Sequence, residues 1–355
     1  MRVGYDSNRV DEAADTIGIV SHTVMRQAVN RCAFTLLEML VVVVVIGLLL
    51  GLLLPAIGKV REAANRMGCA MNLKQLGLAA AHYDCAFQKL PPGYLGPRPE
   101  RGADPQPDYR FQFVGVLPYL LPYLEQGVTH DRINADLPAD YFSSSSVYPG
   151  WWTYPSAFTA AETKIRLFLC PSDNGSAAIG AADVVLHPVR LESEGWQLIR
   201  AGLSNTGPGN ALGPTNYLGV SGYSGVIGVA GNDLLAGCLY NRSSVRISDV
   251  AAADGTSNTL LFGESSSPAG ALLPARSWMG TGAMPIAFGL PSDTVHNGWW
   301  HFSSRHPGIV QFCLCDGSVR GIRKGLMPGS RDYDILIRAA AWHDGTSIDL
   351  AGISN

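Results

Sequence analysis

The chain contains an uncharged apolar run of 20 residues, from Met39 to Gly58. As a helix with a rise of about 1.5 Å per residue, this run would span about 30 Å, the thickness of the hydrocarbon core of a bilayer. A helix inside a globular protein rarely stays apolar on every side over such a length. The run therefore predicts a membrane-inserting helix. A cleavable secretion signal is the alternative, and it fits less well because no small-x-small cleavage site follows the run.

One carboxylate, Glu38, directly precedes this run. A charged side chain at the edge of a bilayer costs on the order of a few kcal/mol unless it is paired, and such residues usually mark a function. Cleavage of the chain before Phe34 would create a partner, because the new α-amino group is a cation four residues from Glu38. We therefore expect this amino group to neutralise the acid, within one subunit or, more favourably, from a neighbouring subunit.

The residues around this acid resemble a known N-terminal segment. The stretch AFTLLE (33–38), with the apolar run behind it, looks like the N-terminus of a type IV prepilin or a type II secretion pseudopilin. The resemblance implies that a prepilin peptidase cuts between Ala33 and Phe34 and that the new amino group is methylated. Glu38 would then be the fifth mature residue, and Pro55 would occupy the place of the family's helix-kinking proline. The sequence departs from the family at Ala33, where glycine is usual.

We expect residues 1–33 to form a leader that is removed. Residues 1–24 carry mixed charges and no apolar stretch, whereas a start at Met25 would give the short basic leader MRQAVNRCA. The sequence favours translation from Met25, with a long leader as the alternative. Arg26 and Arg31 favour a cytoplasmic N-terminus. Because basic residues also follow the run, it is mainly the resemblance that implies a single-pass inner-membrane protein with its C-terminal domain in the periplasm or outside the cell.

The apolar run continues into a second helical segment. We expect residues 34–58 to form the transmembrane part of a pilin N-terminal helix and residues 59–90 to form its amphipathic continuation. Apolar side chains recur in this continuation at roughly helical spacing. The stripe comprises Val60, Ala63, Ala64, Met67, Met71, Leu78 and Ala81. We expect the continuation to pack on a globular domain formed by residues 91–355.

The sequence of this domain favours many turns and short β-strands. Forty glycines and 22 prolines mark the turns. Strands are predicted at 164–171, 215–222 and 258–264. A short helix is expected at 248–255, with Ser248 and Gly255 as its caps, and loops are expected at 141–160 and 174–214. The predicted fold class is α+β and pilin-like, with a long N-terminal membrane-spanning helix followed by a loop-rich antiparallel β-sheet domain.

A second motif lies near the C-terminus, where His306 is followed by nine residues and then by Asp316-Gly317. This spacing resembles the H-x(9)-DG domain, a large bacterial family of unknown function that carries prepilin-type N-termini. Further segments fit the family in its order, namely ANRMGCAMNLKQLGLA (64–79), LPYLEQ (121–126), FLCPSD (168–173), TNYLGVSG (215–222) and DGTSNTLLFGE (254–264). The resemblance covers roughly residues 31–322, and it implies export and pilin-like processing but no reaction.

The residues between His306 and Asp316 argue against catalysis by this pair. Apolar and polar residues alternate over 310–315, as in a half-buried strand. Asp316-Gly317 predicts a two-residue type I′ turn into a return strand at 318–322. At about 3.3 Å per residue, the two side chains would lie about 30 Å apart, beyond hydrogen-bond reach. We therefore interpret His306, Asp316 and Gly317 as structural residues, with the histidine bonded to neighbouring backbone.

The cysteines and the other histidines do not define a site. Six cysteines lie beyond the membrane segment, and they are Cys69, Cys85, Cys170, Cys238, Cys313 and Cys315. Six cysteines allow fifteen disulfide connectivities, and free buried thiols are the alternative. His296, His301 and His306 recur every five residues, which fits neither one helix face nor one strand face. No metal site is therefore predicted, and a zinc site built from loops is the alternative.

Several classes of function are disfavoured. A net charge of −3 and 15% charged residues give no basis for binding nucleic acid. The sequence contains no nucleophile elbow, no phosphate-binding loop and no H-E-x-x-H motif, so no enzyme activity, catalytic residue or cofactor is predicted. The pairs Trp151-Trp152 and Trp299-Trp300 are interpreted as packing residues, with stacking on sugars as the alternative.

The first hypothesis for function is an exported structural subunit that resembles pilins and pseudopilins. It would be processed by the prepilin peptidase and anchored in inner-membrane lipid. It would then assemble with itself or with other pilin-like subunits into a pilus or pseudopilus. The alternative is a membrane-tethered periplasmic or surface domain that binds a ligand and uses the pilin-type segment as an anchor. An exported hydrolase is a third hypothesis, for which no catalytic constellation is found.

Overall fold

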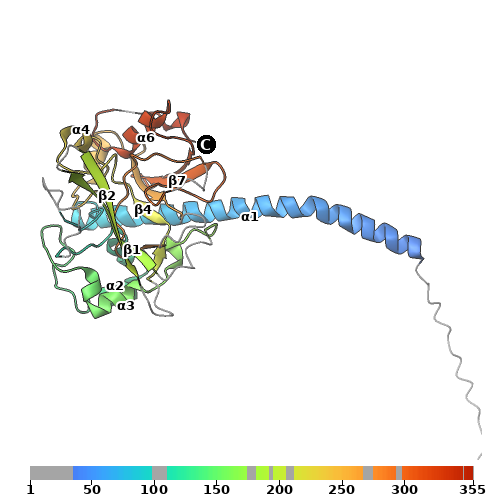
Figure 1. Cartoon of the computed structure of the whole chain (residues 1–355), viewed down its shortest axis with the longest axis horizontal. Helices are drawn as coiled ribbons and strands as arrows, with labels where there is room; N and C mark the ends of the chain where they lie inside the picture. Colours follow the sequence, from blue (N-terminus) through green and yellow to red (C-terminus); the bar gives the residue numbers. More distant parts are fainter. Residues whose placement is uncertain are drawn as a thin grey trace, which may run out of the picture. The chain divides into compact units, whose positions relative to one another are not determined.

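The structure is a computed structural model of the whole chain (Figure 1). It describes residues 35–97, 110–173, 181–191, 195–204, 212–266, 275–292, 298–346 and 348–354. The predicted leader and the cleavage residues Ala33 and Phe34 lie outside the described residues. The chain divides into two compact units, Met1–Ala56 and Ile57–Asn355, and each is described by itself.

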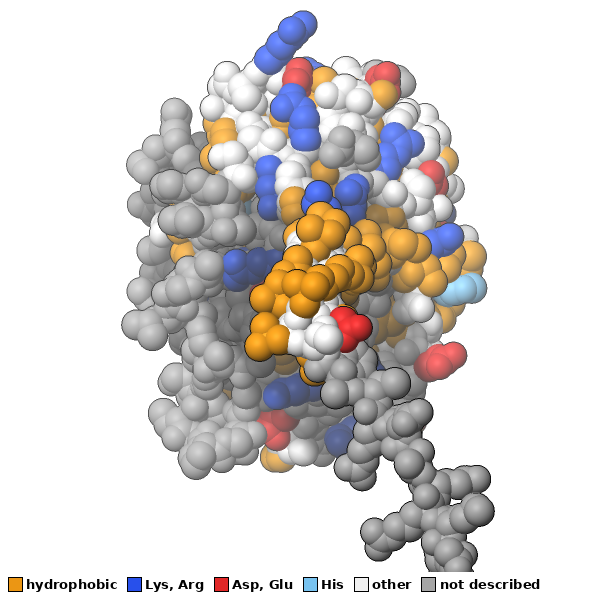
Figure 2. Space-filling view, turned by 90° about the vertical axis from the view of Figure 1, so that its right-hand side faces the viewer, with side chains coloured by type: hydrophobic (Ala, Val, Ile, Leu, Met, Phe, Trp, Pro, Cys, Tyr) orange, Lys and Arg blue, Asp and Glu red, His pale blue; other side chains and the backbone are white. Residues whose placement is uncertain are grey.

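The first unit contains the beginning of helix α1 (Leu36–Phe87), which is 52 residues long and includes Pro55 without ending there. Every described side chain from Leu36 to Ala56 is exposed. Figure 2 shows hydrophobic side chains gathered on this helix. Because a helix satisfies its backbone hydrogen bonds internally, such a segment can cross hydrocarbon. Among the described residues, α1 is the one helix that is long and apolar enough to span a membrane, as predicted.

In the second unit, α1 packs on the domain with a face that the sequence did not single out. Its buried side chains recur at spacings of three and four residues, and they include Cys69, Leu73, Leu76, Ala80 and Tyr83. The predicted stripe is largely on the opposite face. For example, Met67 is 71% exposed and Met71 is 58% exposed. The expectation that the Met/Ala stripe packs on the domain is therefore wrong, because the helix carries two apolar faces and the domain covers the other one.

The sheet that α1 contacts at Gln311 is antiparallel, with strand order β4-β5-β7-β8. The strands are β4 (Tyr217–Gly219), β5 (Leu260–Glu264), β7 (Ile309–Leu314) and β8 (Val319–Arg323). All six residues of β7 are buried, which corrects the half-buried prediction. Val310 and Phe312 pack in one apolar cluster, whereas Cys313 packs in a second cluster that contains the buried face of α1. Both faces of β7 are therefore covered.

The turn between β7 and β8 is formed by Asp316-Gly317, but its type differs from the prediction. Gly317 has a φ of 78°, whereas Asp316 is not among the residues with positive φ that a type I′ turn requires. The Gly317 N–H donates to the carbonyl of Leu314, and the Leu314 N–H donates to the carbonyl of Ser318. The connection is thus a three-residue loop that begins at Cys315. The Asp316 carboxylate accepts from the Ser318 N–H at 2.8 Å, which fixes the return strand.

A second sheet has strand order β2-β1-β6-β3. Its strands are β1 (Ala181–Leu191), β2 (Gly195–Ser204), β6 (Ala275–Ser277) and β3 (Pro214–Thr215). The prediction of a loop at 174–214 is therefore wrong for 181–191 and 195–204, where β1 and β2 lie. β1 and β2 pair antiparallel along nearly their whole lengths, while β1 pairs with β6 only at Ala182 and Asp183. Pro188 is tolerated inside β1 because, among the described residues, no strand pairs with the second edge of β1 at this point.

Short helices connect and cover the sheets. They are η1 (Leu117–Tyr123), α2 (Gly127–Asn134), η2 (Trp151–Thr153), α3 (Pro155–Ala161), η3 (Arg166–Phe168), α4 (Ala230–Asp233), α5 (Ile247–Ala252), α6 (Tyr333–Ala340) and η5 (Leu350–Gly352). The strand predicted at 164–171 is wrong, because η3 lies there. The helix predicted at 248–255 is confirmed as α5, but Arg246 precedes it and no side chain caps it, so the cap assigned to Ser248 is wrong. The α+β fold class is confirmed.

Candidate functional site

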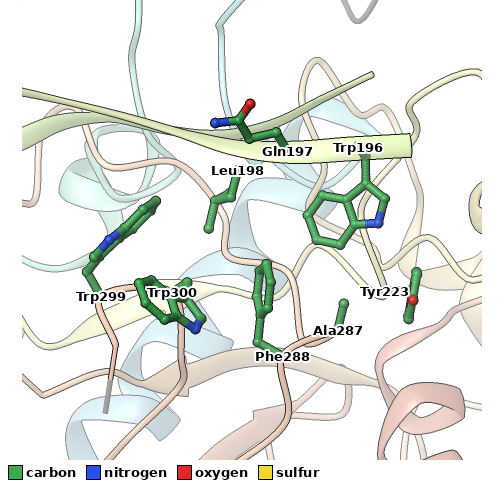
Figure 3. A pocket seen from close by; sticks show the side chains of 8 residues that line it. All are labelled: Trp196, Gln197, Leu198, Tyr223, Ala287, Phe288, Trp299 and Trp300. Atoms are coloured by element: carbon green, nitrogen blue, oxygen red, sulfur yellow. The ribbon is translucent and has the colours of Figure 1, made fainter. Parts of the chain in front are cut away.

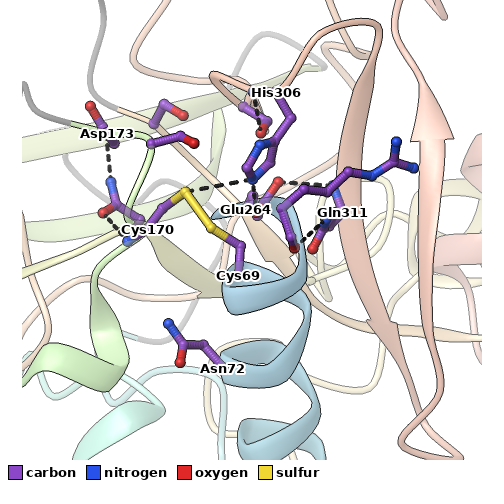
Figure 4. A network of polar contacts seen from close by, with 12 residues as sticks. Cys69, Asn72, Cys170, Asp173, Glu264, His306 and Gln311 are labelled. Atoms are coloured by element: carbon purple, nitrogen blue, oxygen red, sulfur yellow. Dashed lines mark hydrogen bonds and ion pairs between the residues drawn. A yellow bond between two sulfur atoms is a disulfide. The ribbon is translucent and has the colours of Figure 1, made fainter. Parts of the chain in front are cut away.

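His306 lies at the centre of a buried polar network just before β7 (Figure 4). Its side chain is fully buried, with no exposed surface. Its Nδ1 is 2.5 Å from Oε1 of Glu62, which belongs to α1. Its Nε2 is 3.4 Å from Oε1 of Glu264 and 3.7 Å from Sγ of Cys170. The predicted bonding of the imidazole to neighbouring backbone is therefore wrong, because three side chains that are distant in sequence face the ring.

Glu264 is held in place by the sheet. It is the last residue of β5, and its Oε2 accepts from the Gln311 N–H of β7 at 3.0 Å. The Gln311 side chain in turn donates from Nε2 to the carbonyl of Arg66 on α1 at 2.9 Å. The other oxygen of Glu264, Oε1, is buried and accepts no hydrogen bond from the part of the chain that the structure describes. Oε1 of Glu264 therefore faces His306, while the hydrogen bond of Oε2 to β7 holds the carboxylate in position.

A disulfide joins α1 to the segment after η3 at the same place. Cys69 of α1 is bonded to Cys170, with a Cα–Cα distance of 5.4 Å and a sequence separation of 101. The sequence left fifteen connectivities open, and the structure selects this pair. Among the described residues the free cysteines are the exposed Cys85 and a buried group that comprises Cys238, Cys313 and Cys315. The bond connects the buried face of α1 covalently to the domain.

A second layer of polar contacts surrounds this centre. Asn216 accepts from the Cys170 N–H at 2.9 Å and donates to Asp173 at 2.7 Å. Asp173 also forms an ion pair with Arg305 at 3.5 Å. On the other side, Nζ of Lys324 donates to the carbonyl of His306 at 2.9 Å. These contacts fix the backbone on both sides of the imidazole, so the ring has little freedom to turn.

The electrostatics of the centre favour a cation between the two acids. Burial by itself lowers the pKa of His306, but the carboxylates of Glu264 and Glu62 outweigh this effect and raise the pKa above its usual value. Burial also lowers the pKa of Lys324, although the charge of Glu264 acts in the opposite direction. Two carboxylates therefore face one imidazole, and this arrangement favours the protonated form of His306.

The structure does not bring the other predicted site residues to this network. The six-residue strand β7 lies between His306 and Asp316, and the Asp316 carboxylate is used in the turn. Glu38 forms a capping box at the start of α1, because its carboxylate accepts from the Thr35 N–H at 2.9 Å and its own N–H donates to the Thr35 hydroxyl at 3.2 Å. Pro55 lies within α1.

Sequence reasoning found His306 but missed its partners. A signal was present, because Cys69, Cys170 and Glu264 each lie within a segment that matched the H-x(9)-DG pattern in order. Within the described part of the chain, these three residues and His306 form a group that could hold a metal ion, with ligand atoms that all lie within 4.8 Å of one another. The zinc alternative built on three histidines is not reproduced, since His301 is absent from this group and His296 lies outside the described residues.

An aromatic cleft lies elsewhere on the domain (Figure 3). It has a volume of about 500 Å³ and is lined by Trp196, Gln197, Leu198, Tyr223, Ala287, Phe288, Trp299 and Trp300. Trp299 and Trp300 are half-buried and belong to this cleft, whereas Trp151 is fully buried in the core. The pair Trp299-Trp300 is therefore placed where a ligand can reach it, whereas Trp151 of the other pair is a packing residue.

Two protein-family models match the chain. Residues 58–326 match the family described as a protein of unknown function (DUF1559), and residues 29–54 match the prokaryotic N-terminal methylation motif. The search of curated proteins and the search of solved structures each returned no match. The first match contains every residue of the His306 network described above, and the second contains Glu38 and the beginning of the apolar run.

Proposed function

From the premise that the chain belongs to the DUF1559 family and carries a prokaryotic N-terminal methylation motif, we propose that it is a structural subunit of a pilus or pseudopilus. The motif makes it a prepilin-like protein of the type IV pilin or pseudopilin type. In the proposed function, the prepilin peptidase cuts before Phe34. The inner membrane then holds the mature protein through α1 until α1 packs against pilin-like neighbours.

The observation that carries this proposal is the outward face of α1 in the second unit. Its apolar residues are Val60, Ala64, Met67, Met71, Leu78 and Ala81. These residues follow a repeat of alternating four- and three-residue spacings, in which Lys74 occupies the position between Met71 and Leu78. This is the repeat with which one helix packs along another. Val60, Met67 and Leu78 are 70%, 71% and 48% exposed, so the single chain leaves this face uncovered.

An uncovered apolar helix face of this length supports assembly with other subunits. Contiguous exposed apolar surface on a protein usually marks an interaction site. The occupant that best fits a helix face with this repeat is the same face of another pilin-like helix, because knobs and holes then match. The segment from Leu36 to Ala56 is also apolar and exposed. It can therefore leave the lipid and pack against the same neighbouring helix in a filament.

Glu38 has two compatible roles in this proposal. Within the chain it caps α1 through Thr35. In the assembly, the same carboxylate would face the methylated amino group of Phe34 from a neighbouring subunit, which offsets the cost of an acid at the rim of an apolar bundle. The disulfide at Cys69 supports export of the domain to an oxidising compartment, since such bonds rarely persist in the cytosol. We propose no enzymatic activity for the domain.

The direct test replaces the outward face of α1 with charge. In the double variant Met67→Lys/Met71→Lys, the protein should fold and stay in the membrane, but its recovery in sheared filament fractions should fall at least about tenfold, because two charges would be buried between helices. Val128→Lys/Leu234→Lys is the matched control, since Val128 is 76% exposed and Leu234 is 49% exposed outside α1. Normal filament recovery of the α1 variant would end the proposal.

A second experiment tests the N-terminus. Mass spectrometry of the protein from its host should find N-methyl-Phe34 as the first residue. Glu38→Ala should leave this processed protein in the membrane and remove it from filaments. An uncut N-terminus, or normal assembly of Glu38→Ala, would contradict the role proposed for the acid.

The aromatic cleft favours a second candidate function, a membrane-tethered domain that binds a neutral ligand. Three tryptophans and a phenylalanine supply flat apolar faces to the cleft, whereas the Gln197 amide points to the other side of β2 (Figure 3). Such a surface suits stacking on a sugar. Titration of the full-length protein in detergent with neutral oligosaccharides should then change tryptophan fluorescence, and Trp300→Ala should abolish the change. Binding without filament incorporation would favour this candidate over the first.

A further inference from the structure

The ligand-bearing atoms of Cys69, Cys170, Glu264 and His306 converge from four parts of the chain onto one buried point (Figure 4). All four residues are buried, and these atoms lie within 4.8 Å of one another. We propose that this cluster is a Zn²⁺ site whenever the two cysteines are thiols. The proposal does not depend on assembly, because every ligand belongs to one domain.

The set of donor atoms suits zinc. Two thiolate sulfurs, one imidazole nitrogen and one carboxylate oxygen make a four-coordinate set of the kind that zinc prefers in proteins. Zinc bonds of about 2.0 to 2.3 Å place neighbouring ligand atoms about 3.3 to 3.8 Å apart in a tetrahedron. The distances from Nε2 of His306 to Oε1 of Glu264 and to Sγ of Cys170 are 3.4 and 3.7 Å. These two edges of the tetrahedron are therefore already in place.

The surroundings hold each ligand in the orientation that a metal needs. A metal-binding histidine usually donates its other ring N–H to a carboxylate, which fixes its tautomer. Here Nδ1 of His306 lies 2.5 Å from Oε1 of Glu62, so Nε2 points toward the cluster. Oε2 of Glu264 accepts from the Gln311 N–H, which leaves Oε1 for a ligand. Asn216 accepts from the Cys170 N–H and so fixes the backbone of one cysteine.

The contacts of Nε2 require a positive species between acceptors. When Nδ1 donates to Glu62, Nε2 of neutral His306 presents a lone pair to Oε1 of Glu264 and to the sulfur. Oε1 of Glu264 is buried, lies 3.4 Å from Nε2 of His306 and has no hydrogen-bond partner among the described residues. A buried carboxylate oxygen without a partner is costly. A zinc ion at this point would bind both lone pairs, whereas a proton on Nε2 can bridge them only as long as no metal is present.

The chemistry of binding balances without a further reagent. The chain is synthesised with thiols, so metal uptake needs no reductant. Each of the two cysteine S–H groups loses its proton to solvent as its sulfur bonds to the metal, and the imidazole binds through the lone pair of Nε2. In the disulfide, the same sulfurs are bonded to each other and cannot supply thiolates. The metal and the disulfide therefore exclude each other.

The test uses the full-length protein in detergent, purified under a phosphine reductant and without chelators. We expect one Zn²⁺ per chain by atomic emission. With Co²⁺ in its place, we expect sulfur-to-cobalt charge-transfer absorption and the visible bands of a tetrahedral ion. Zn²⁺ should displace the Co²⁺. The protein oxidised at Cys69 and Cys170 should show neither binding nor the spectrum.

Variants assign the ligands. Cys170→Ser and His306→Ala should each weaken Co²⁺ binding at least about tenfold. Glu264→Gln keeps the side-chain volume and the acceptor for the Gln311 N–H, so it should fold normally and still lose about tenfold in affinity. Cys85→Ser is the exposed control, and Cys238→Ala removes one member of the neighbouring thiol pair, in which Sγ of Cys238 lies 3.5 Å from Sγ of Cys315. Both controls should bind as the wild type does.

Three outcomes would overturn the proposal. The first is a reduced wild-type protein that folds and binds no Zn²⁺ or Co²⁺. The second is unchanged affinity and an unchanged spectrum in Glu264→Gln and His306→Ala. The third is loss of the spectrum in Cys238→Ala with retention in Cys170→Ser, which would assign the metal to the other thiol pair. None of these outcomes bears on filament assembly, so the proposed function is tested separately.

Discussion

The two faces of α1 in the second unit are similar in sequence and opposite in environment. The inward face presents Leu73 and Leu76, both fully buried. The outward face presents Met71 and Leu78, which are 58% and 48% exposed. Both faces follow spacings of three and four residues. The difference shows that helical periodicity identifies an apolar face but does not identify its partner.

The inward face also carries features that an apolar pattern does not contain. Cys69 adds a covalent bond to the domain, and Glu62 adds a contact with buried His306. Gly77 adds close approach, because a Cβ at this position would lie 2.5 Å from Sγ of Cys313. On the outward face, Cys85 is a free and exposed thiol. Substitutions of the same residue type on the two faces of α1 can therefore show how much of the effect on stability comes from packing against the domain.

The largest difference is expected for the two cysteines of α1. Cys69→Ser should lower the free energy of unfolding of the oxidised protein by about 4 to 5 kcal/mol, because the disulfide closes a loop with a sequence separation of 101. Cys85→Ser should change it by less than about 0.5 kcal/mol. Denaturant unfolding in detergent, followed by tryptophan fluorescence, measures both variants. Equal stabilities would mean that the bond does not tie α1 to the domain.

A smaller difference is expected for two leucines. Leu73→Ala should lower the free energy of unfolding by about 2 to 4 kcal/mol, since the substitution leaves a cavity between α1 and the domain. Leu78→Ala removes the same atoms from a side chain that is 48% exposed. It should therefore cost less than about 1 kcal/mol in the dissociated subunit. The same unfolding experiment compares the two variants, and a larger loss in Leu78→Ala would reverse the assignment of the faces.

The smallest single effects, which are opposite in sign, are expected for two glycines. Gly77→Ala should lower the free energy of unfolding by about 1 to 3 kcal/mol, because the new methyl group meets Cys313 and forces a shift. A Cβ at Gly68 would meet Pro171 at 3.4 Å, an ordinary contact. Gly68→Ala should therefore raise stability by up to about 1 kcal/mol through helix propensity. Thermal unfolding resolves the sign, and stabilisation by both variants would argue against tight packing at Gly77.

Local sequence signals predicted the elements whose structure is decided locally. The strand at 258–264 and the β7–β8 hairpin were found, because alternation and the Asp316-Gly317 turn are features of neighbouring residues. The long pair β1 and β2 was missed, because its pairing spans a loop-like composition and Pro188 suggests a break. Burial of both faces of β7 was missed for a different reason. It depends on α1, which lies more than 200 residues earlier in the chain and contacts Gln311 through Arg66.

The residues of the candidate site also differ in whether local sequence could predict them. His306 could be selected from its motif, whereas Glu62 could not, because the two residues are separated by 244 positions and no local pattern links them. The pairing of Cys69 with Cys170 was one of many possible connectivities until the fold placed the two residues together. Segments that match a family in order indicate which residues are candidates for a site. They do not indicate which of these residues contact one another in the folded protein.

By itself the sequence determined that this protein has a helix long and apolar enough to span a membrane, with an acid at its start. Bilayer thickness and the absence of charge are one-dimensional properties that can be read along the chain. Only the tertiary structure decided which face of α1 the domain covers and which face stays exposed. It also decided that His306 meets two acids and the sulfur of Cys170. Such contacts depend on the packing of elements whose separation in sequence carries no information about distance in space.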